Sequence, residues 1–184
     1  VSFPEEMTRW PLPDLGVLDQ VFAGIGGAFS VLFTGSLPAG LQWDAITGAT
    51  PLSTIQSRLG NADMMSEIVL APIFGSMAGA GWEWISLALL AGGIWLLRRG
   101  VIYWHAPAAL LGSLFLMSLL FFLIDGDRSA SPLVHLLSGG TMLGAFFIAT
   151  DPVSGASTPR GRLVFGAGAG LLTFVIRQWG SYPD

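Results

Sequence analysis

The stretch from Tyr103 to Ile124 constrains the fold more than any other part of the chain. It holds eleven Leu, Ile or Phe residues and no formally charged residue. At roughly −0.3 to −0.6 kcal/mol for each such residue near the centre of a helix, these side chains favour insertion into a bilayer by about 3–7 kcal/mol. A segment of this length and composition is typical of a transmembrane helix.

Three further apolar stretches accompany it. Charged residues make up only 11% of the chain, against about 25% in a soluble domain. A soluble globule, a disordered chain and a nucleic-acid-binding protein are therefore disfavoured. We expect an all-α polytopic membrane protein in contact with lipid, with about four spans at residues 77–97, 103–124, 133–149 and 163–179.

The first third of the chain has a different character. Residues 1–16 are rich in proline, residues 17–34 are apolar but interrupted by glycine, and residues 35–67 form a turn-rich loop. A loop of this length is usually functional or disordered. We expect residues 1–67 to be an outer-face segment with short helices and residues 68–184 to be the membrane domain. The 18 residues from 17 to 34 could just span a bilayer, but their glycines and the flanking acid make a short interfacial helix as compatible, and we favour the latter.

Arginine sets the expected orientation, because cytoplasmic loops are enriched in basic residues. Two turns hold four of the eight arginines, namely Arg98, Arg99, Arg160 and Arg162. These turns are predicted to be cytoplasmic. The 35–67 loop and the turn from Asp125 to Arg128 then face the other side, which is the periplasm if this is the inner membrane of a Gram-negative bacterium.

Cysteine is absent. The chain therefore cannot ligate an iron–sulfur cluster, attach haem through thioethers or build a cysteine-based zinc site. No metal site is predicted. Any redox cofactor must be held in another way.

One motif in the outer loop carries possible chemistry, the run Asp44-Ala45-Ile46-Thr47-Gly48-Ala49-Thr50-Pro51. It is compatible with a plain turn, since Gly and Pro break structure and Asp or Thr caps the next element. It is also compatible with covalent attachment of FMN, in which a transferase cleaves FAD and joins the FMN phosphate to a hydroxyl. That reaction needs an exposed hydroxyl with small neighbours and an upstream acid. Thr50 is then the acceptor, and Asp44, Thr47, Gly48 and Ala49 form the recognition segment.

Several stretches together resemble one family, which contains the membrane protein RnfD of the Rnf electron-transport complex and NqrB of the sodium-pumping NADH:quinone oxidoreductase. The resemblance covers nearly the whole chain. It rests on Asp44–Leu52, Gly79–Trp84, Leu90–Leu97, His135–Val153 and Arg160–Leu163.

The resemblance implies a phosphoester-linked FMN on Thr50, attached on the outer face of the membrane. It raises riboflavin as a second, non-covalent flavin, which no residue locates. It also implies a transporter-like bundle of two inverted halves. Because family members continue beyond both ends of this sequence, we expect the chain to be an internal piece.

Other candidate sites have simpler interpretations. The run from Asp151 to Ser157 echoes the acceptor motif, with Ser157 in the acceptor place, but it lies in a predicted cytoplasmic loop and is more simply a helix-ending turn. His105 and His135 are expected about 30 Å apart, too far to ligate one haem. Glu83, between two tryptophans, is expected at the outer interface, and a role in an ion path stays open.

Two functions are compatible with these observations. In the first, the chain is a membrane redox subunit with covalent FMN, working with other subunits in a complex that moves Na⁺ or H⁺ and is linked to ferredoxin or NADH. It would not be catalytic alone. In the second, it is a flavin-free transporter or channel-like protein.

Overall fold

The chain forms two compact units, Val1–Thr50 and Pro51–Asp184. The computed structural model describes residues 29, 32–33, 50–61, 63–71, 73–75, 77–79 and 82–180. The interfacial helix expected at 17–34 lies almost entirely outside this set. The second unit contains the helices discussed below. The boundary at residue 68 between an outer-face segment and a membrane domain stays a prediction.

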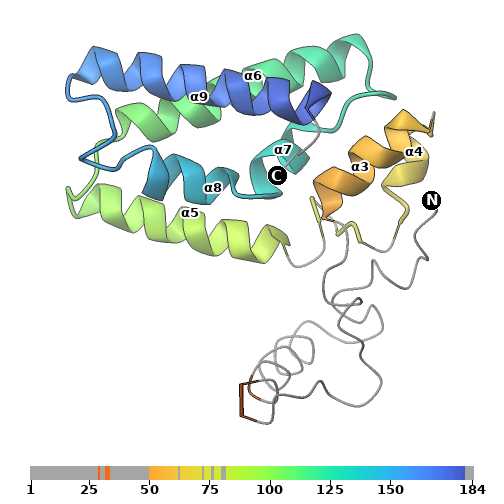
Figure 1. Cartoon of the computed structure of the whole chain (residues 1–184), viewed down its shortest axis with the longest axis horizontal. Coiled ribbons are helices and arrows are strands. Elements are labelled where there is room, and N and C mark those ends of the chain that lie inside the picture. Colours follow the sequence, from red (N-terminus) through yellow and green to blue (C-terminus); the bar gives the residue numbers. More distant parts are fainter. Residues whose placement is uncertain are drawn as a thin grey trace. The chain divides into compact units, whose positions relative to one another are not determined.

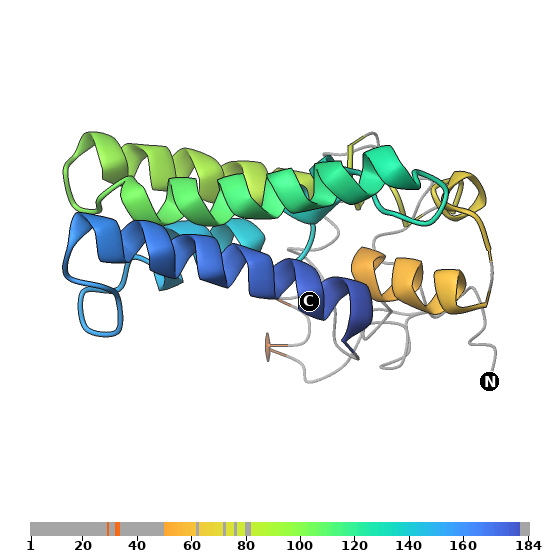
Figure 2. The same ribbon diagram turned by 90° about the horizontal axis from the view of Figure 1, so that it is seen from above.

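Three long helices run along this unit, α5 (Trp82–Arg98), α6 (His105–Ile124) and α9 (Pro159–Trp179). Of these, α6 and α9 lie side by side, and α5 lies apart from them (Figures 1 and 2). At 1.5 Å per residue, the 20 residues of α6 span about 30 Å, the thickness of a bilayer core. Among the described helices, α6 is the one long and apolar enough to cross a membrane by length and composition.

The ends of α5 and α9 follow local sequence signals. Gly100 has a positive φ of 71°, its N–H donates to the carbonyl of Leu97, and the N–H of Val101 donates to that of Leu96. This pattern is a Schellman motif, which favours glycine and ends α5. α9 begins at Pro159, earlier than the expected residue 163, because the hydroxyl of Thr158 accepts from the N–H of Gly161 and caps the helix.

The segment predicted as one span over 133–149 is broken in the structure. It consists of α7 (Pro132–Leu137), α8 (Thr141–Leu143) and a π-helix, η2 (Gly144–Ile148). The break falls at Ser138-Gly139-Gly140, where Gly139 takes a positive φ of 63° that other residues rarely adopt. Discontinuous helices of this kind occur in transporters, where they bring backbone groups to a site inside the bundle.

The broken segment packs between α5 on one side and α6 on the other. Its residues Leu137, Met142, Ala145 and Phe146 form the main core together with Leu110 of α6. Gly93 of α5 permits this packing, because a Cβ at that position would overlap the ring of Phe146.

The α6 and α9 helices approach through two glycines of α9. A Cβ on Gly166 would lie 3.1 Å from the Cα of Ala106, and one on Gly170 would lie 3.2 Å from the carbonyl carbon of Leu110. The backbones therefore meet with little side chain between them. Close packing through small residues is the usual means of helix association in lipid.

Two short helices cover one end of this unit, α3 (Pro51–Gly60) and α4 (Met65–Ile68). They lie where α6 ends and α7 begins (Figure 1). A second core cluster joins them to the turn after α6, and its buried members are Leu52, Ile55, Met65, Ile68, Ala130 and Val134. Regular structure in the described part of the chain is thus helical, as predicted. The inverted repeat stays a prediction.

Candidate functional site

The predicted acceptor, Thr50, immediately precedes α3. It is half-buried, and Pro51 is the first residue of the helix. Proline is favoured at this position, and the residue before it is the N-cap. The first turn of a helix has N–H groups without helical partners and a partial positive charge, which suit a phosphate. The other four predicted residues, Asp44, Thr47, Gly48 and Ala49, lie outside the described residues.

Pro51 is held against the turn that leads into α5. Its side chain is fully buried. It lies against Gly79, where an added Cβ would overlap the proline ring and would lie 3.3 Å from Cδ1 of Trp82. Residues far apart in the sequence therefore meet at the start of α3.

Glu83 lies in the first turn of α5 and is only 8% exposed. Its Oε2 accepts a hydrogen bond of 3.2 Å from the N–H of Met77. A Cβ added to Gly75 would lie 3.0 Å from Oε1. The carboxylate therefore fastens the turn before α5, a contact that the sequence did not reveal. Its flanking residues differ, since Trp82 is half-buried and Trp84 is exposed.

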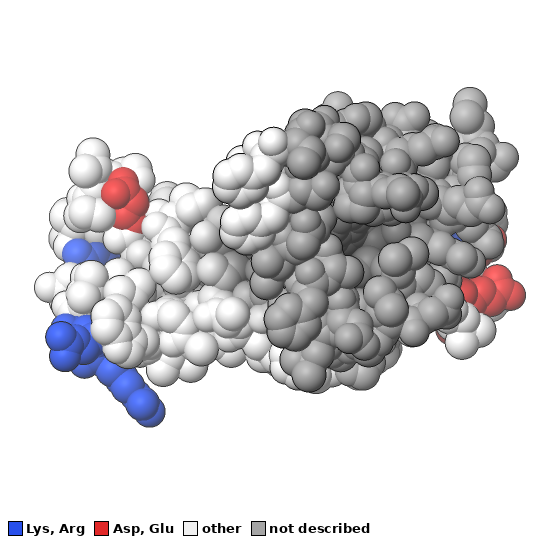
Figure 3. Space-filling view, turned by 90° about the horizontal axis from the view of Figure 1, so that it is seen from below, with Lys and Arg blue, Asp and Glu red and all other residues white. Residues whose placement is uncertain are grey.

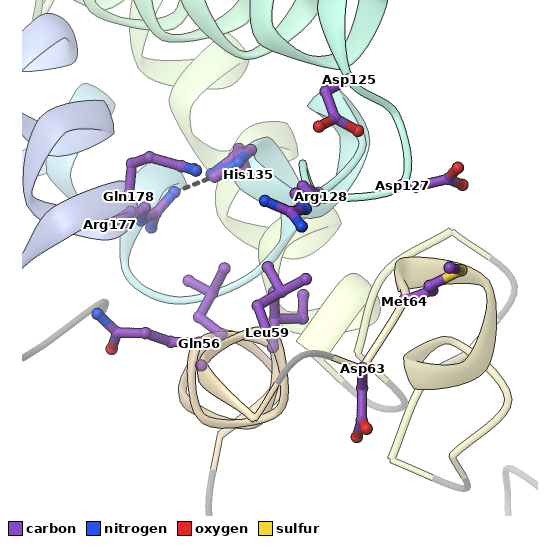
Figure 4. Close-up of a pocket in the computed structure, with 14 residues that line it drawn as sticks. Gln56, Leu59, Asp63, Met64, Asp125, Asp127, Arg128, His135, Arg177 and Gln178 are labelled. Carbon is purple, nitrogen blue, oxygen red and sulfur yellow. Dashed lines mark hydrogen bonds between the residues drawn. The ribbon is translucent and has the colours of Figure 1, made fainter.

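A cavity of about 750 Å³ opens beside α3. Figure 4 shows the side chains of Arg128, His135 and Arg177 gathered above this helix. The cavity is lined from four segments, namely α3 with the residues after it, the turn between α6 and α7, His135 of α7, and the end of α9. These are segments for which the arginine counts predict one common side of the membrane.

Arg177 is hydrogen-bonded to the broken segment, although it lies near the end of the last predicted span and is only 7% exposed. Its Nη1 donates to the carbonyl of His135, and its Nη2 donates to the carbonyl of Ser138 and the hydroxyl of Thr141. These groups flank the break between α7 and α8. Arg177 is not among the site residues predicted from the sequence, although an arginine within an apolar stretch is a recognisable signal of function.

The opposite end of the unit carries the other turns. Figure 3 shows arginine side chains gathered at the end that holds the α5–α6 loop and the loop before α9. The guanidinium of Arg162 lies 4.1 Å from the ring centre of Tyr103 and donates to the carbonyl of Ala156. The two arginine-bearing turns thus lie at one end of the unit, and the turn from Asp125 to Arg128 lies at the other (Figure 1). This grouping agrees with successive helices running in alternate directions, which was assumed in predicting the orientation.

The second acceptor-like motif lies at this opposite end. The carboxylate of Asp151 accepts from the N–H and the hydroxyl of Ser154, and these bonds lower the pKa of Asp151 below its usual value. They close a local turn. Ser157 is exposed one residue before the cap of α9. The motif has a structural explanation and lies at the other end of the helices from α3 (Figure 1).

The two histidines are also separated. His105 is the first residue of α6, whereas His135 lies in α7, which packs against α6 toward its other end (Figure 1). His135 is buried against the ring of Phe174, and His105 stacks on Trp104. The length of α6 keeps them from sharing one metal ion.

Comparison with known sequences places the chain in a family. The sequence profile of the NQR2, RnfD, RnfE family matches residues 1–184. The chain belongs to this family. The resemblance noted from the motifs is thereby confirmed.

Similar proteins share one name, that of the D subunit of an ion-translocating oxidoreductase complex. The protein of that name from Vibrio vulnificus strain YJ016 is 48% identical over all of this chain and 55% of its own length. The one from Pseudomonas paraeruginosa is 50% identical over all of this chain and 51% of its own length. That from Escherichia fergusonii is 47% identical, again over the whole chain, and 54% of its own length. The chain spans about half the length of these curated relatives.

The described part of the predicted acceptor site is compatible with a phosphate-linked group. Thr50 supplies a hydroxyl, and α3 is a helix of 10 residues whose first turn offers N–H groups and a positive partial charge to an anion. Pro51, the first residue of this turn, contributes no N–H.

Proposed function

We propose that this chain is part of a membrane redox subunit that carries FMN on Thr50 within an ion-translocating electron-transport complex. The observation that carries the proposal is the match of its whole length to proteins named as the D subunit of an ion-translocating oxidoreductase complex. The acceptor-type motif ending at Thr50 supports the cofactor assignment.

Attachment would be a phosphoryl transfer without oxidation or reduction. The Thr50 oxygen attacks the FMN phosphorus of FAD, a new oxygen–phosphorus bond forms, the pyrophosphate bond breaks and AMP leaves. The hydroxyl proton passes to a base of the transferase. This chain supplies the nucleophile and its presentation, and the start of α3 favours the charged phosphodiester product.

Bound FMN would supply electron transfer, which a chain without cysteine cannot obtain from thiolate-held clusters. The role of the protein in this proposal is to hold the attachment point next to a helix, α3, that is packed on the rest of the unit. Leu52 and Ile55 of α3 are buried in the second core cluster, so the helix that comes after Thr50 is anchored on the unit. In this proposal the acceptor loop faces the periplasm, other subunits of the complex handle soluble donors, and the transported ion is Na⁺ or H⁺.

The test is covalent flavin on the full-length protein. The protein is expressed with and without the flavin transferase in cells, denatured, separated on a gel and viewed under ultraviolet light. We expect a fluorescent band that requires the transferase and disappears in Thr50→Val. A transferase active on a control substrate but without effect on the unmutated protein would overturn the flavin assignment and favour the flavin-free transporter. Fluorescence that survives Thr50→Val and disappears in Ser157→Ala would move the site to the opposite end.

A further inference from the structure

The geometry points to Gly79 and Glu83 as positioning residues for the acceptor Thr50, acting through Pro51. This inference rests on the proposed function. Neither residue belongs to the acceptor motif, and both lie about thirty residues beyond it in the sequence. Their effect follows from one line of contacts inside the helical unit.

The first contact is between Gly79 and Pro51. The proline is fully buried, and a Cβ on Gly79 would lie 2.9 Å from the Cβ of Pro51 and would overlap the rest of its ring. Real Cβ atoms do not approach so closely. Because Gly79 has no side chain, it leaves a space that the ring of Pro51, the first residue of α3, occupies. We call this space the seat of Pro51.

The second contact holds that seat in place. The N–H of Gly75 donates to the carbonyl of Ala78 at 2.6 Å, and Phe74 and Gly79 form an antiparallel bridge. The Glu83 carboxylate accepts from Met77 in the same turn. Because Glu83 is buried in the first turn of a 17-residue helix, the turn is tied to one of the three long helices.

The remainder of α3 is fixed independently by the second core cluster, to which Leu52 and Ile55 belong. Pro51 is therefore held from two directions, by the core beneath α3 and by the turn before α5. Thr50 is bonded directly to Pro51, so the position of Pro51 in its seat fixes the point at which the residue with the acceptor hydroxyl joins α3. Transfer reactions need the nucleophile aligned with the reacting atom, and a displacement of about 1 Å can slow them about a hundredfold.

The experiment measures the rate at which the full-length protein takes up flavin from FAD and the purified transferase, by in-gel fluorescence against time. Gly79→Ala is expected to slow uptake at least about tenfold, because the new methyl group displaces Pro51. Gly168→Ala is the matched control, since a Cβ at that helical position meets nothing within 4 Å. It should label at the unmutated rate.

Two further variants separate positioning from general damage. Pro51→Ala removes the ring atoms beyond Cβ, including the one nearest the added methyl group, and leaves only the tight contact of 2.9 Å between the two Cβ atoms. Combining it with Gly79→Ala should therefore restore most of the rate of Pro51→Ala alone. Glu83→Ala should slow uptake, whereas Glu83→Gln, which keeps an oxygen acceptor for Met77, should largely restore it. Thermal unfolding in detergent is followed for every variant.

The outcomes are distinct. Unmutated protein that takes up no flavin overturns the proposed function and this inference with it. Unmutated protein that labels normally, with Gly79→Ala and Glu83→Ala labelling at the same rate, overturns the inference alone. If Gly79→Ala lowers stability, the double variant decides: recovery of stability without recovery of labelling also overturns the inference.

Discussion

The guanidinium of Arg177 donates a hydrogen bond of 2.5 Å from Nη1 to the main-chain carbonyl of His135. The last carbonyls of a helix have no partner within it, and a cation at that end is favourable. Arg177 belongs to α9, and it thus supplies a hydrogen-bond donor to a carbonyl at the C-terminal end of another helix, α7. The positive charge of Arg177 is stabilised by main-chain carbonyls at the break between α7 and α8, where the helical hydrogen-bond pattern is interrupted.

Arg177→Met should destabilise the full-length protein by at least about 2 kcal/mol, because the carbonyl of Ser138 loses its arginine donor in a buried site. Unfolding of the purified protein by added denaturing detergent measures this. Arg160→Met, at an exposed position, is the control and should change stability little. Equal stability of the two variants would contradict the role given to Arg177.

Gly170→Leu should separate α6 from α9, because a side chain there runs into Ser113 and the Leu110 carbonyl. We expect a loss of about 1–3 kcal/mol or more. Gly168→Ala lies on the same helix with open space around it and should gain about 0.5–1 kcal/mol from helix propensity. Thermal unfolding in detergent compares the two. Similar losses for both variants would show that the close approach is not the cause.

Ser86→Ala should cost about 1 kcal/mol. The hydroxyl of Ser86 donates 2.7 Å to the carbonyl of Leu137, the last residue of α7, and so joins α5 to the break. Ser118 is equally buried, but its hydroxyl donates to Phe115 within α6. Ser118→Ala is therefore the matched control, and the same detergent unfolding should show a smaller effect. The reverse order would contradict this assignment.

The Asp151 turn should show a defined pH dependence. Hydrogen bonds from Ser154 lower the pKa of Asp151, so their stabilising effect is present above the ordinary aspartate pKa of about 4 and is lost as pH falls through the lower pKa of the folded turn. Ser154→Ala should raise the Asp151 pKa toward the ordinary value. A carboxyl-carbon NMR titration of aspartate-labelled protein measures it, with Ser157→Ala as the control. An unchanged pKa in Ser154→Ala would refute the cause given.

The helices and their grouping were predictable because they depend on local composition. The apolar run from Tyr103 to Ile124 predicts a helix, and α6 occupies His105–Ile124. The turns carrying arginine meet at one end, as alternation along the chain requires. The family, too, was recognisable from short motifs.

The break in the third segment was harder to predict, because its apolar residues continue across it. Ser138-Gly139-Gly140 was the available signal, since paired glycines mark turns. The contact between Pro51 and Gly79 could not be predicted from the sequence around either residue. A close approach depends on how distant elements pack, and the small residue that permits it looks like any other glycine.

The glycine contact between α6 and α9 has a consequence for motion. With Gly166 and Gly170 lying on the backbone of α6, sliding or rotation of either helix would press one main chain against the other. The α7–α8 segment has a bend at Gly139 instead of a continuous hydrogen-bond ladder. A relative shift of elements in this unit would meet less resistance at that bend, where Arg177 bonds to groups on both sides of the break.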